Sequence, residues 1–503
     1  EIGKVIKEKF NIELEYLPIT GDQREKQNLM LASGDYPEIM RIEGEDIVRK
    51  YIQAGAAIQL DEYLSEGKNF TERFKEQIPY WKISGEGKLY KWESAIPQQF
   101  EVDPEVFDMG VRTDALEKQG WPALVSEDDW FNFLKKAMED FPQTNGQKTI
   151  GMTAPLAEGW GLPGLIIMVE KGGVYVDQAT NDSVTWNQLE QKWEHMFTNK
   201  HTLENIKFFN RLYRAGILDK DCFTDFMGQV SEKIKAGRAL SMWYTCWEIP
   251  AANTELEAAG HPEMQYVKLP IRSNSQVEAG LKRQIRVETT RSWDSFIITK
   301  NAKDPKRLFQ MLDWGVSDEG QVLLQSGIEG KQYKIVDSKR VPTDEMVKGI
   351  KEDPLYKEKV GLGLFYFFGN CKTLGNDGVA YDLMKDATFM DSLFLTDRQK
   401  EAFQKLGWKT SIDYWLQTGV SAPNGLAGSC SLDPSSEEGK LNQKVTEFRS
   451  KATAKLITAK SDEQYDKLLQ SLLAEYEKLN PQKVIDKYNQ ILEENKKKLE
   501  QYK

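Results

Sequence analysis

Aromatic residues gather at two places along the chain where their side chains could stack against a ligand. The first place is the segment 243–248 and the second is the run 365–368, which lies between glycines. Sugar rings present flat patches of C–H groups that stack on aromatic faces, while their hydroxyls need amide, carboxylate or guanidinium partners. The candidate binding residues, including isolated tryptophans elsewhere, are Trp243, Tyr244, Trp247, Glu248, Tyr366, Phe367, Phe368, Trp92, Trp160 and Trp293.

A basic segment supplies possible polar partners for such a ligand. Lys282, Arg283, Arg286 and Arg291 fall within the range 282–291. The planar guanidinium of arginine pairs well with the carboxylate or sulfate of an acidic sugar. A solvated loop with dispersed positive charge is the alternative. We take Arg286 and Arg291 as candidate ligand contacts.

Motifs for catalysis are poorly represented. The three histidines form no HExxH motif, and the chain has neither a GxSxG elbow nor a Walker A loop. The segment 159–164 satisfies GxGxxG, but Pro163 disrupts the helix start that a dinucleotide site needs, so we expect a loop there. A glycosidase pair of carboxylates stays open, because the sequence does not give the distance between two acids. We expect no catalytic residues and no cofactor.

Composition sets the class of protein. The 503 residues carry a formal charge of −11, with 67 basic and 78 acidic side chains, which argues against a broad nucleic-acid surface. No apolar run approaches the ~18 residues of a membrane span. The four cysteines are far apart in the sequence, so clustered metal ligation is not expected, and they are either buried free thiols or include one disulfide.

The elements that must position these residues follow an α/β pattern. The beginning of the chain predicts a helix over 1–10, a strand over 11–17, a helix over 22–33 and a strand over 38–42. Strand, helix and strand in close succession indicate a parallel βαβ unit.

Further helices are predicted at 126–140, where Ser126 and Asp129 form a capping box, and at 203–215, 305–315 and 397–406. The last ~60 residues are predicted to be helical, with a second capping box at Ser461 and a break at Pro481. The helix over 484–502 is either a coiled-coil partner or, as we favour, an outer helix on one apolar stripe.

Several segments resemble one known family in their order along the chain. The segment 27–39, QNLMLASGDYPEI, resembles the early signature of family 1 extracellular solute-binding proteins, most of all the subgroup with alginate-binding and oligosaccharide-binding lipoproteins. Weaker matches follow in the expected order at 55–64, 87–90, 111–114, 236–240 and 327–333.

The resemblance implies a two-lobed periplasmic-binding-protein-like fold of type II. Such a fold has mixed sheets flanked by helices, a ligand cleft between lobes that close by a hinge, and here a helical C-terminus. We expect lobe 1 to comprise 1–107 plus about 292–345, and lobe 2 to comprise 108–291 plus about 346–503. By position, Trp247 matches the family's stacking tryptophan, Arg286 or Arg291 its arginine, and 365–368 another aromatic wall.

The function implied is that of an extracellular protein that captures an oligosaccharide and delivers it to the permease of an ABC transporter, as a monomer and without catalysis. A lipid on a preceding segment would anchor it to a membrane, at a Gram-positive cell surface rather than in a periplasm. A secreted carbohydrate-active enzyme and the binding subunit of a surface sensor are the alternatives. The basic segment favours an acidic glycan, and a neutral one fits as well.

One departure from the family concerns calcium. Many relatives hold the ion in an acidic loop that corresponds to 140–149 here. This chain keeps Asp140, Asn145 and Gly146 but has Lys148 where acids are expected. Since calcium needs several oxygen ligands, preferably with carboxylates, we predict no structural calcium here and assign no metal-ligand residues.

Overall fold

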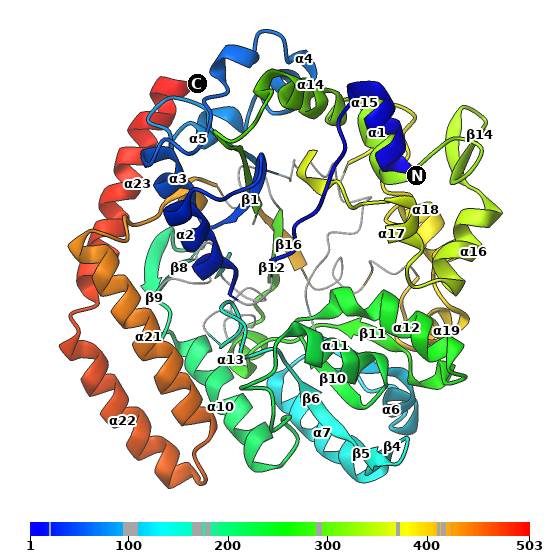
Figure 1. Ribbon diagram of the computed structural model, residues 1–503. Helices are drawn as coiled ribbons and strands as arrows, with labels where there is room; N and C mark the ends of the chain where they lie inside the picture. Colours follow the sequence, from blue (N-terminus) through cyan, green and yellow to red (C-terminus); the bar gives the residue numbers. More distant parts are fainter. Residues whose placement is uncertain are drawn as a thin grey trace.

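The two lobes lie one above the other, with the last three helices along one side (Figure 1). The computed structural model describes residues 1–19, 22–93, 109–162, 175–176, 183–187, 189–287, 294–368, 373–409, 413, 419–423 and 425–503. All structural statements below concern these residues.

The upper lobe is built on a small antiparallel sheet. Its strand order is β1 (Ile39–Glu43), β13 (Asp294–Ile298) and β2 (Trp92–Glu93). Strand β13 thus returns from far along the chain to pair with both early strands. The predicted strand over 38–42 is confirmed, as is the preceding helix, α2 (Gln23–Ser33), which begins after the capping residue Asp22.

The predicted strand over 11–17 and the parallel βαβ unit are wrong. Helix α1 (Ile2–Phe10) forms as expected, but Asn11 then takes a left-handed conformation with φ 52° and the chain continues without regular structure. Ile12 and Leu14 pack against the upper core, which explains the alternation in the sequence. Among the described residues, no strand pairs with this segment. The alternation in the sequence therefore arises because one side of the segment is buried, and not because the segment forms a strand.

The lower lobe contains a mixed sheet, as expected. Its strand order is β11 (Tyr266–Leu269), β3 (Met109–Arg112), β10 (Ala239–Trp243) and β6 (Ile150–Thr153). Strand β10 runs parallel to β6 and antiparallel to β3. The sheet is covered by helices that include α7 (Glu127–Asp140), α10 (Lys200–Arg214) and α12 (Ile249–Ala258).

Short sheets complete the described architecture. The two segments that form β12 (Arg283–Val287) and β16 (Gly419–Pro423) pair in parallel near the centre of Figure 1. The other small sheets contain β4 (Gln143–Thr144) with β5 (Gln147–Lys148), β7 (Tyr175–Val176) with β8 (Val184–Asn187) and β9 (Lys192–His195), and β14 (Tyr333–Val336) with β15 (Lys339–Pro342).

Most predicted helices form close to their expected bounds. Helix α7 carries the expected capping box, in which the Ser126 hydroxyl accepts from the Asp129 amide and Asp129 accepts from the Ser126 amide. Other helices in the described residues are α3 (Glu45–Gln53), α4 (Lys68–Arg73), α5 (Ile78–Trp81), α6 (Thr113–Lys118), α11 (Met227–Lys235), α13 (Asn274–Glu278), α14 (Pro305–Gly315), α15 (Asp318–Gln321), α16 (Asp344–Glu352), α17 (Tyr356–Val360), α18 (Ala387–Phe389) and α19 (Asp397–Lys405).

The segment over about 346–383 packs in the upper lobe. Met346, Phe368 and Leu383 belong to the same apolar core as Ile2 and Phe296 of the upper lobe. This segment was expected in lobe 2. It packs in the upper lobe because its aromatic and aliphatic side chains complete that core.

The C-terminal helices are α21 (Glu437–Ile457), α22 (Asp462–Lys478) and α23 (Gln482–Tyr502). Helix α21 packs on α10 of the lower lobe. Helix α23 buries one stripe, which includes Val484, Tyr488 and Leu499, so the interpretation as an outer helix is confirmed. Its end reaches the upper lobe, where Lys498 pairs with Glu86 at 2.8 Å between Nζ and Oε1. Helix α23 therefore connects both lobes.

Cys222, Cys246 and Cys430 are buried thiols that form no disulfide bond, in agreement with the first of the two interpretations for the cysteines, while Cys371 lies outside the described residues. None of the helices in the described part of the chain combines the length and the apolar composition that a membrane-spanning segment needs.

Candidate ligand-binding site

Three of the predicted binding residues come together in one aromatic group of the lower lobe. The ring centroids of Tyr244 and Trp247 lie 5.5 Å apart at an interplanar angle of 88°. The Trp160 ring lies 6.1 Å from each of them, although it comes from a distant part of the sequence. Trp247 is 40% exposed, unusually high for so large an apolar side chain. The group thus offers an accessible aromatic surface.

The end of β10 positions this group. Trp243 is the last residue of the strand, and Tyr244 then takes φ 71°, a left-handed conformation that a bulky residue rarely adopts. The chain turns there into the short 3-10 helix Cys246–Glu248, which places Trp247 at the surface. Residues in such strained backbone conformations cluster at binding and active sites.

The loop that carries Trp160 lies beside the upper lobe. The Asp22 side chain caps α2 through one oxygen, Oδ1, and a Cβ atom placed on Gly159 would lie 3.0 Å from the other, Oδ2. In the lower lobe, the Glu158 carboxylate accepts a hydrogen bond from the Met227 amide at 2.8 Å, which ties the loop to the start of α11. The aromatic group therefore lies close to the boundary between the lobes.

Glu248 supplies a carboxylate next to this aromatic group. It is half-buried, and its Oε2 accepts a hydrogen bond from the Ser231 hydroxyl at 2.5 Å. Ser231 belongs to α11, so that helix fixes one oxygen of the carboxylate. A carboxylate held in this way can accept hydrogen bonds from sugar hydroxyls beside a stacked ring.

Other predicted contacts prove to be core residues. Trp243 is 1% exposed and its ring centroid lies 4.8 Å from that of Phe209, while Trp92 is 1% and Phe368 0% exposed. Phe367 is 8% exposed and packs on Phe368 with ring centroids 4.3 Å apart. The prediction that these four rings touch ligand is corrected, because neighbouring side chains already cover their faces. Burial of this kind depends on tertiary contacts that the local sequence does not contain.

The upper lobe nevertheless presents one aromatic ring that the sequence analysis did not propose. Tyr16 is 52% exposed and lies 6.2 Å from Phe365 and 6.4 Å from Phe367 between ring centroids. Its hydroxyl donates to the Leu364 carbonyl at 2.6 Å. A strand over 11–17 would place Tyr16 on the same apolar face as Ile12 and Leu14, so the local pattern contains no sign that this ring is exposed.

The remaining predicted residues have no described side chain. Arg286 lies on β12, where its backbone is in register with Ala422 of β16, and Tyr366 lies in a short 3-10 helix beside Phe367. The side chains of both are outside the described part, as are all atoms of Arg291 and Trp293. The basic segment therefore stays a prediction.

The polar cluster around His201 does not have the geometry of a catalytic triad. The Nδ1 atom of His201 lies 3.0 Å from the Ser273 Oγ and 3.1 Å from the Ser275 Oγ. The nearest carboxylate, from Glu204, approaches the same nitrogen at 3.6 Å. A triad needs the nucleophile and the acid on opposite ring nitrogens. Ser273 also caps α13, which gives the cluster a structural role.

One carboxyl group has the raised pKa that a general acid requires. Burial between α7 and α10 raises the pKa of Glu127 to about 8, opposed mainly by the hydrogen bond from Asn205. The side chain is 3% exposed. A glycosidase acid must reach the leaving oxygen of its substrate, and this carboxyl is enclosed by protein. We interpret Glu127 as a structural group.

This buried carboxyl should make stability depend on pH. The folded protein retains the Glu127 proton between about pH 4.5 and about 8, where the unfolded chain releases it. The stabilising contribution of this proton to folding is complete below about pH 4.5. It decreases as pH rises from there, by up to about 1.4 kcal/mol per pH unit, and is lost as pH passes about 8. We expect Glu127→Gln to remove this slope and to be more stable than the wild type above pH 8, measured by urea unfolding. Parallel curves for the two proteins would contradict the assignment.

The segment that corresponds to the calcium loop forms a tight hairpin. Strands β4 and β5 are joined by Asn145 and Gly146, both with positive φ. Asp140 pairs with Lys136 at 2.8 Å between Oδ1 and Nζ, and the Arg112 guanidinium donates to the Thr144 hydroxyl at 3.0 Å. These contacts satisfy Asp140 and Thr144 without a cation. The described residues contain no cluster of three or more potential metal ligands.

Chelation should therefore leave the protein unchanged. We expect millimolar EDTA not to alter the melting temperature, because the described residues bring no three potential metal ligands together. The measurement is thermal unfolding with EDTA, with added calcium and with neither. A melting temperature that falls with EDTA and recovers with calcium would show that the prediction is wrong.

Comparisons with known proteins point to one kind of fold. The alginate-binding protein AlgQ2, solved without calcium ion, matches with a TM-score of 0.63 at 16% identity, covering 98% of this chain and 94% of that one. An EF-hand mutant of FusA, the substrate-binding protein of a Streptococcus pneumoniae ABC transporter, in complex with fructo-nystose, matches with a TM-score of 0.62 at 14% identity over 98% and 95%. The chain has the fold of the solute-binding proteins of ABC transporters.

The sequence comparisons are weaker than the structural ones. Lipoprotein LipO of Bacillus subtilis (strain 168) is 22% identical over 324 residues, which is 62% of this chain. The matched part spans 60% of the length of this curated relative. No protein-family model matches the chain. The fold class expected from the resemblance is confirmed, and the solute-binding fold accounts for the two sheets, the helices that flank them and the helical C-terminus.

Proposed function

We propose that this protein captures an oligosaccharide outside the cell and delivers it to the permease of an ABC transporter. The observation that carries the proposal is the exposed aromatic group of Trp160, Tyr244 and Trp247, beside the boundary between two lobes of a solute-binding fold. Aromatic faces beside a fixed carboxylate suit the apolar patches and the hydroxyls of a sugar. The printed names of AlgQ2 and of the FusA complex support a carbohydrate.

The proposed ligand lies between the lobes and contacts both of them. Trp247 stacks on one sugar ring, and Glu248 accepts hydrogen bonds from its hydroxyls. Tyr16 offers an aromatic ring from the upper lobe. The basic segment around Arg286 and Arg291 favours a uronic-acid unit, although a neutral oligosaccharide satisfies the aromatic surface equally well.

The protein acts as a monomer in this proposal, and lipid on a preceding segment anchors it to the cell surface. The name of LipO supports the lipid. Permease subunits are the protein partners, and the protein itself leaves the sugar unchanged. The enclosed Glu127 and the geometry at His201 support binding over catalysis.

Thermal unfolding against a panel of neutral and uronic-acid oligosaccharides tests this proposal. A ligand that binds only the folded protein at 100 times its dissociation constant adds about 2.7 kcal/mol to the free energy of unfolding. We expect at least one oligosaccharide to raise the melting temperature, and its charge would decide the role of the basic segment. A panel without any shift would contradict the carbohydrate assignment.

A further inference from the structure

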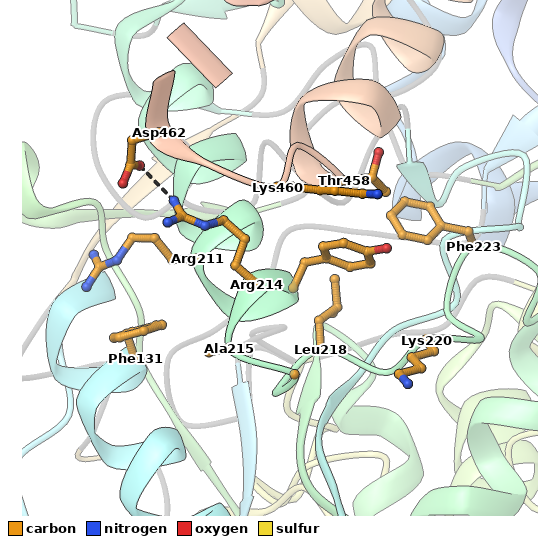
Figure 2. Close-up of a pocket in the computed structure, with 12 residues that line it drawn as sticks. Phe131, Arg211, Arg214, Ala215, Leu218, Lys220, Phe223, Thr458, Lys460 and Asp462 are labelled. Carbon is orange, nitrogen blue, oxygen red and sulfur yellow. Dashed lines mark hydrogen bonds and ion pairs between the residues drawn. The ribbon is translucent and has the colours of Figure 1, made fainter. Parts of the chain in front are cut away.

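A second concave site lies in the lower lobe, away from the aromatic group described above. It is a surface cavity of about 1080 Å³ where α10 ends and α22 begins (Figure 2). None of its lining residues belongs to the Trp160, Tyr244 and Trp247 group. Its volume is similar to that of a typical small-molecule site.

Part of the charge around this cavity has a structural explanation. Arg214 pairs with Asp462 at 2.8 Å, and Arg211 pairs with Asp128. The arginines lie in the last turn of α10 and Asp462 in the first turn of α22, where each charge complements its helix dipole. These pairs join the end of α10 to the starts of α22 and α7 and need no ligand.

Two lysines do not fit that explanation. Lys220 and Lys460 line the cavity, and Figure 2 shows them along opposite edges of it. Both are exposed, and neither forms an ion pair with an acidic residue of the described chain. The protein as a whole carries a formal charge of −11, so two unpaired cations in one concavity form a local positive site on an acidic surface. A concave wall of low dielectric strengthens their field.

The walls and the floor of the cavity can accept a flat ring. Phe131, Tyr213 and Phe223 contribute half-buried aromatic side chains. The Arg211 guanidinium already stacks on Phe131, 4.2 Å from its ring centroid. Gly216 also lines the cavity, and a Cβ atom there would meet no other atom within 4 Å, so the space beside it is open. A concavity of this volume can hold a single sugar ring.

We propose that this cavity binds an acidic unit of a glycan chain. The carboxylate or sulfate of the sugar lies between Lys220 and Lys460, and its ring lies against the aromatic walls. The site is separate from the proposed oligosaccharide site and does not depend on closure of the lobes. It would hold the protein on an acidic extracellular glycan while the other site remains free for its own ligand.

Calorimetry with the full chain tests this site. The probes are a hexasaccharide of galacturonic acid, a sulfated hexasaccharide and neutral maltohexaose. The double variant Lys220→Gln, Lys460→Gln removes the two unpaired charges without touching an ion pair. The control variant Lys334→Gln, Lys497→Gln removes two exposed lysines on β14 and α23, so that both variants have the same net charge. Each titration is repeated in the Trp247→Ala background.

We expect at least one acidic probe to bind the wild type and the control equally. The Lys220→Gln, Lys460→Gln variant should bind it about 10-fold or more weakly, with a smaller dependence on salt. The loss should be the same in the Trp247→Ala background, which separates this cavity from the proposed oligosaccharide site. Preference for the uronic-acid or for the sulfated probe identifies the anionic group.

Three results would overturn the proposal. The first is equal weakening in the control variant, which would indicate diffuse charge attraction. The second is binding of phosphatidylglycerol vesicles that is lost in the Lys220→Gln, Lys460→Gln variant, which would assign the lysines to a membrane surface. The third is the absence of binding by either acidic probe. A melting temperature equal to that of the wild type shows that each variant is folded.

Discussion

Replacing Trp247 by alanine is expected to weaken oligosaccharide binding about 10- to 100-fold, while the stability of the unliganded protein changes little. A loss of this size corresponds to roughly 1.4–2.8 kcal/mol, which is typical of an aromatic residue at the centre of a binding site. Since the side chain is 40% exposed, its removal leaves no core cavity. Calorimetry with the ligand found in the panel gives the affinity, and urea unfolding gives the stability.

Two further variants test whether the loss of affinity depends on the aromatic ring of Trp247. Trp247→Phe keeps an aromatic face and should retain part of the affinity. Leu189→Ala removes another exposed apolar side chain, 55% exposed, from the turn between β8 and β9, and should bind like the wild type. Unchanged affinity in Trp247→Ala would remove this residue from the binding site.

Replacing Trp243 by alanine should instead lower the stability of the protein. We expect Trp243→Ala to lower the free energy of unfolding by about 3–5 kcal/mol, because it opens a cavity in the core of the lower lobe. The ring is 1% exposed and lies against Phe208 and Phe209. Urea unfolding of the two alanine variants side by side measures the difference.

Trp243→Phe serves as the matched variant for this comparison. It leaves a smaller cavity and should lose less stability than Trp243→Ala. If Trp243→Ala were as stable as the wild type but bound no sugar, Trp243 would be a ligand contact after all. The pair of tryptophans thus separates a core role from a binding role within one short segment.

Local signals in the sequence predicted the helices better than the strands. Helix α14 matches its expected bounds because Pro305 and the apolar spacing act within the segment itself. The capping box of α7 is local in the same way. A strand needs a partner, and the partner of β1 is β13, more than half the chain away. The alternating segment 11–17 looks the same as a strand in sequence but has no such neighbour in the described structure.

The candidate site was predictable only as a set of residue types. The local sequence identified Trp243 and Trp247 equally, and the turn at Tyr244 with its positive φ decides which ring is buried. The approach of Trp160 to Tyr244 depends on a long-range contact. The Lys220 and Lys460 pair gives no motif at all, because two loops bring these lysines to one cavity.

Mass analysis of a saturated sample tests whether the protein binds an oligosaccharide and leaves it intact. The protein is incubated for a day with a slight excess of the best ligand from the panel, separated from free sugar and denatured to release what it held. We expect one sugar per chain, with its mass unchanged. Shortened fragments with added water would show hydrolysis, and a protein that retained no sugar would contradict the binding function itself.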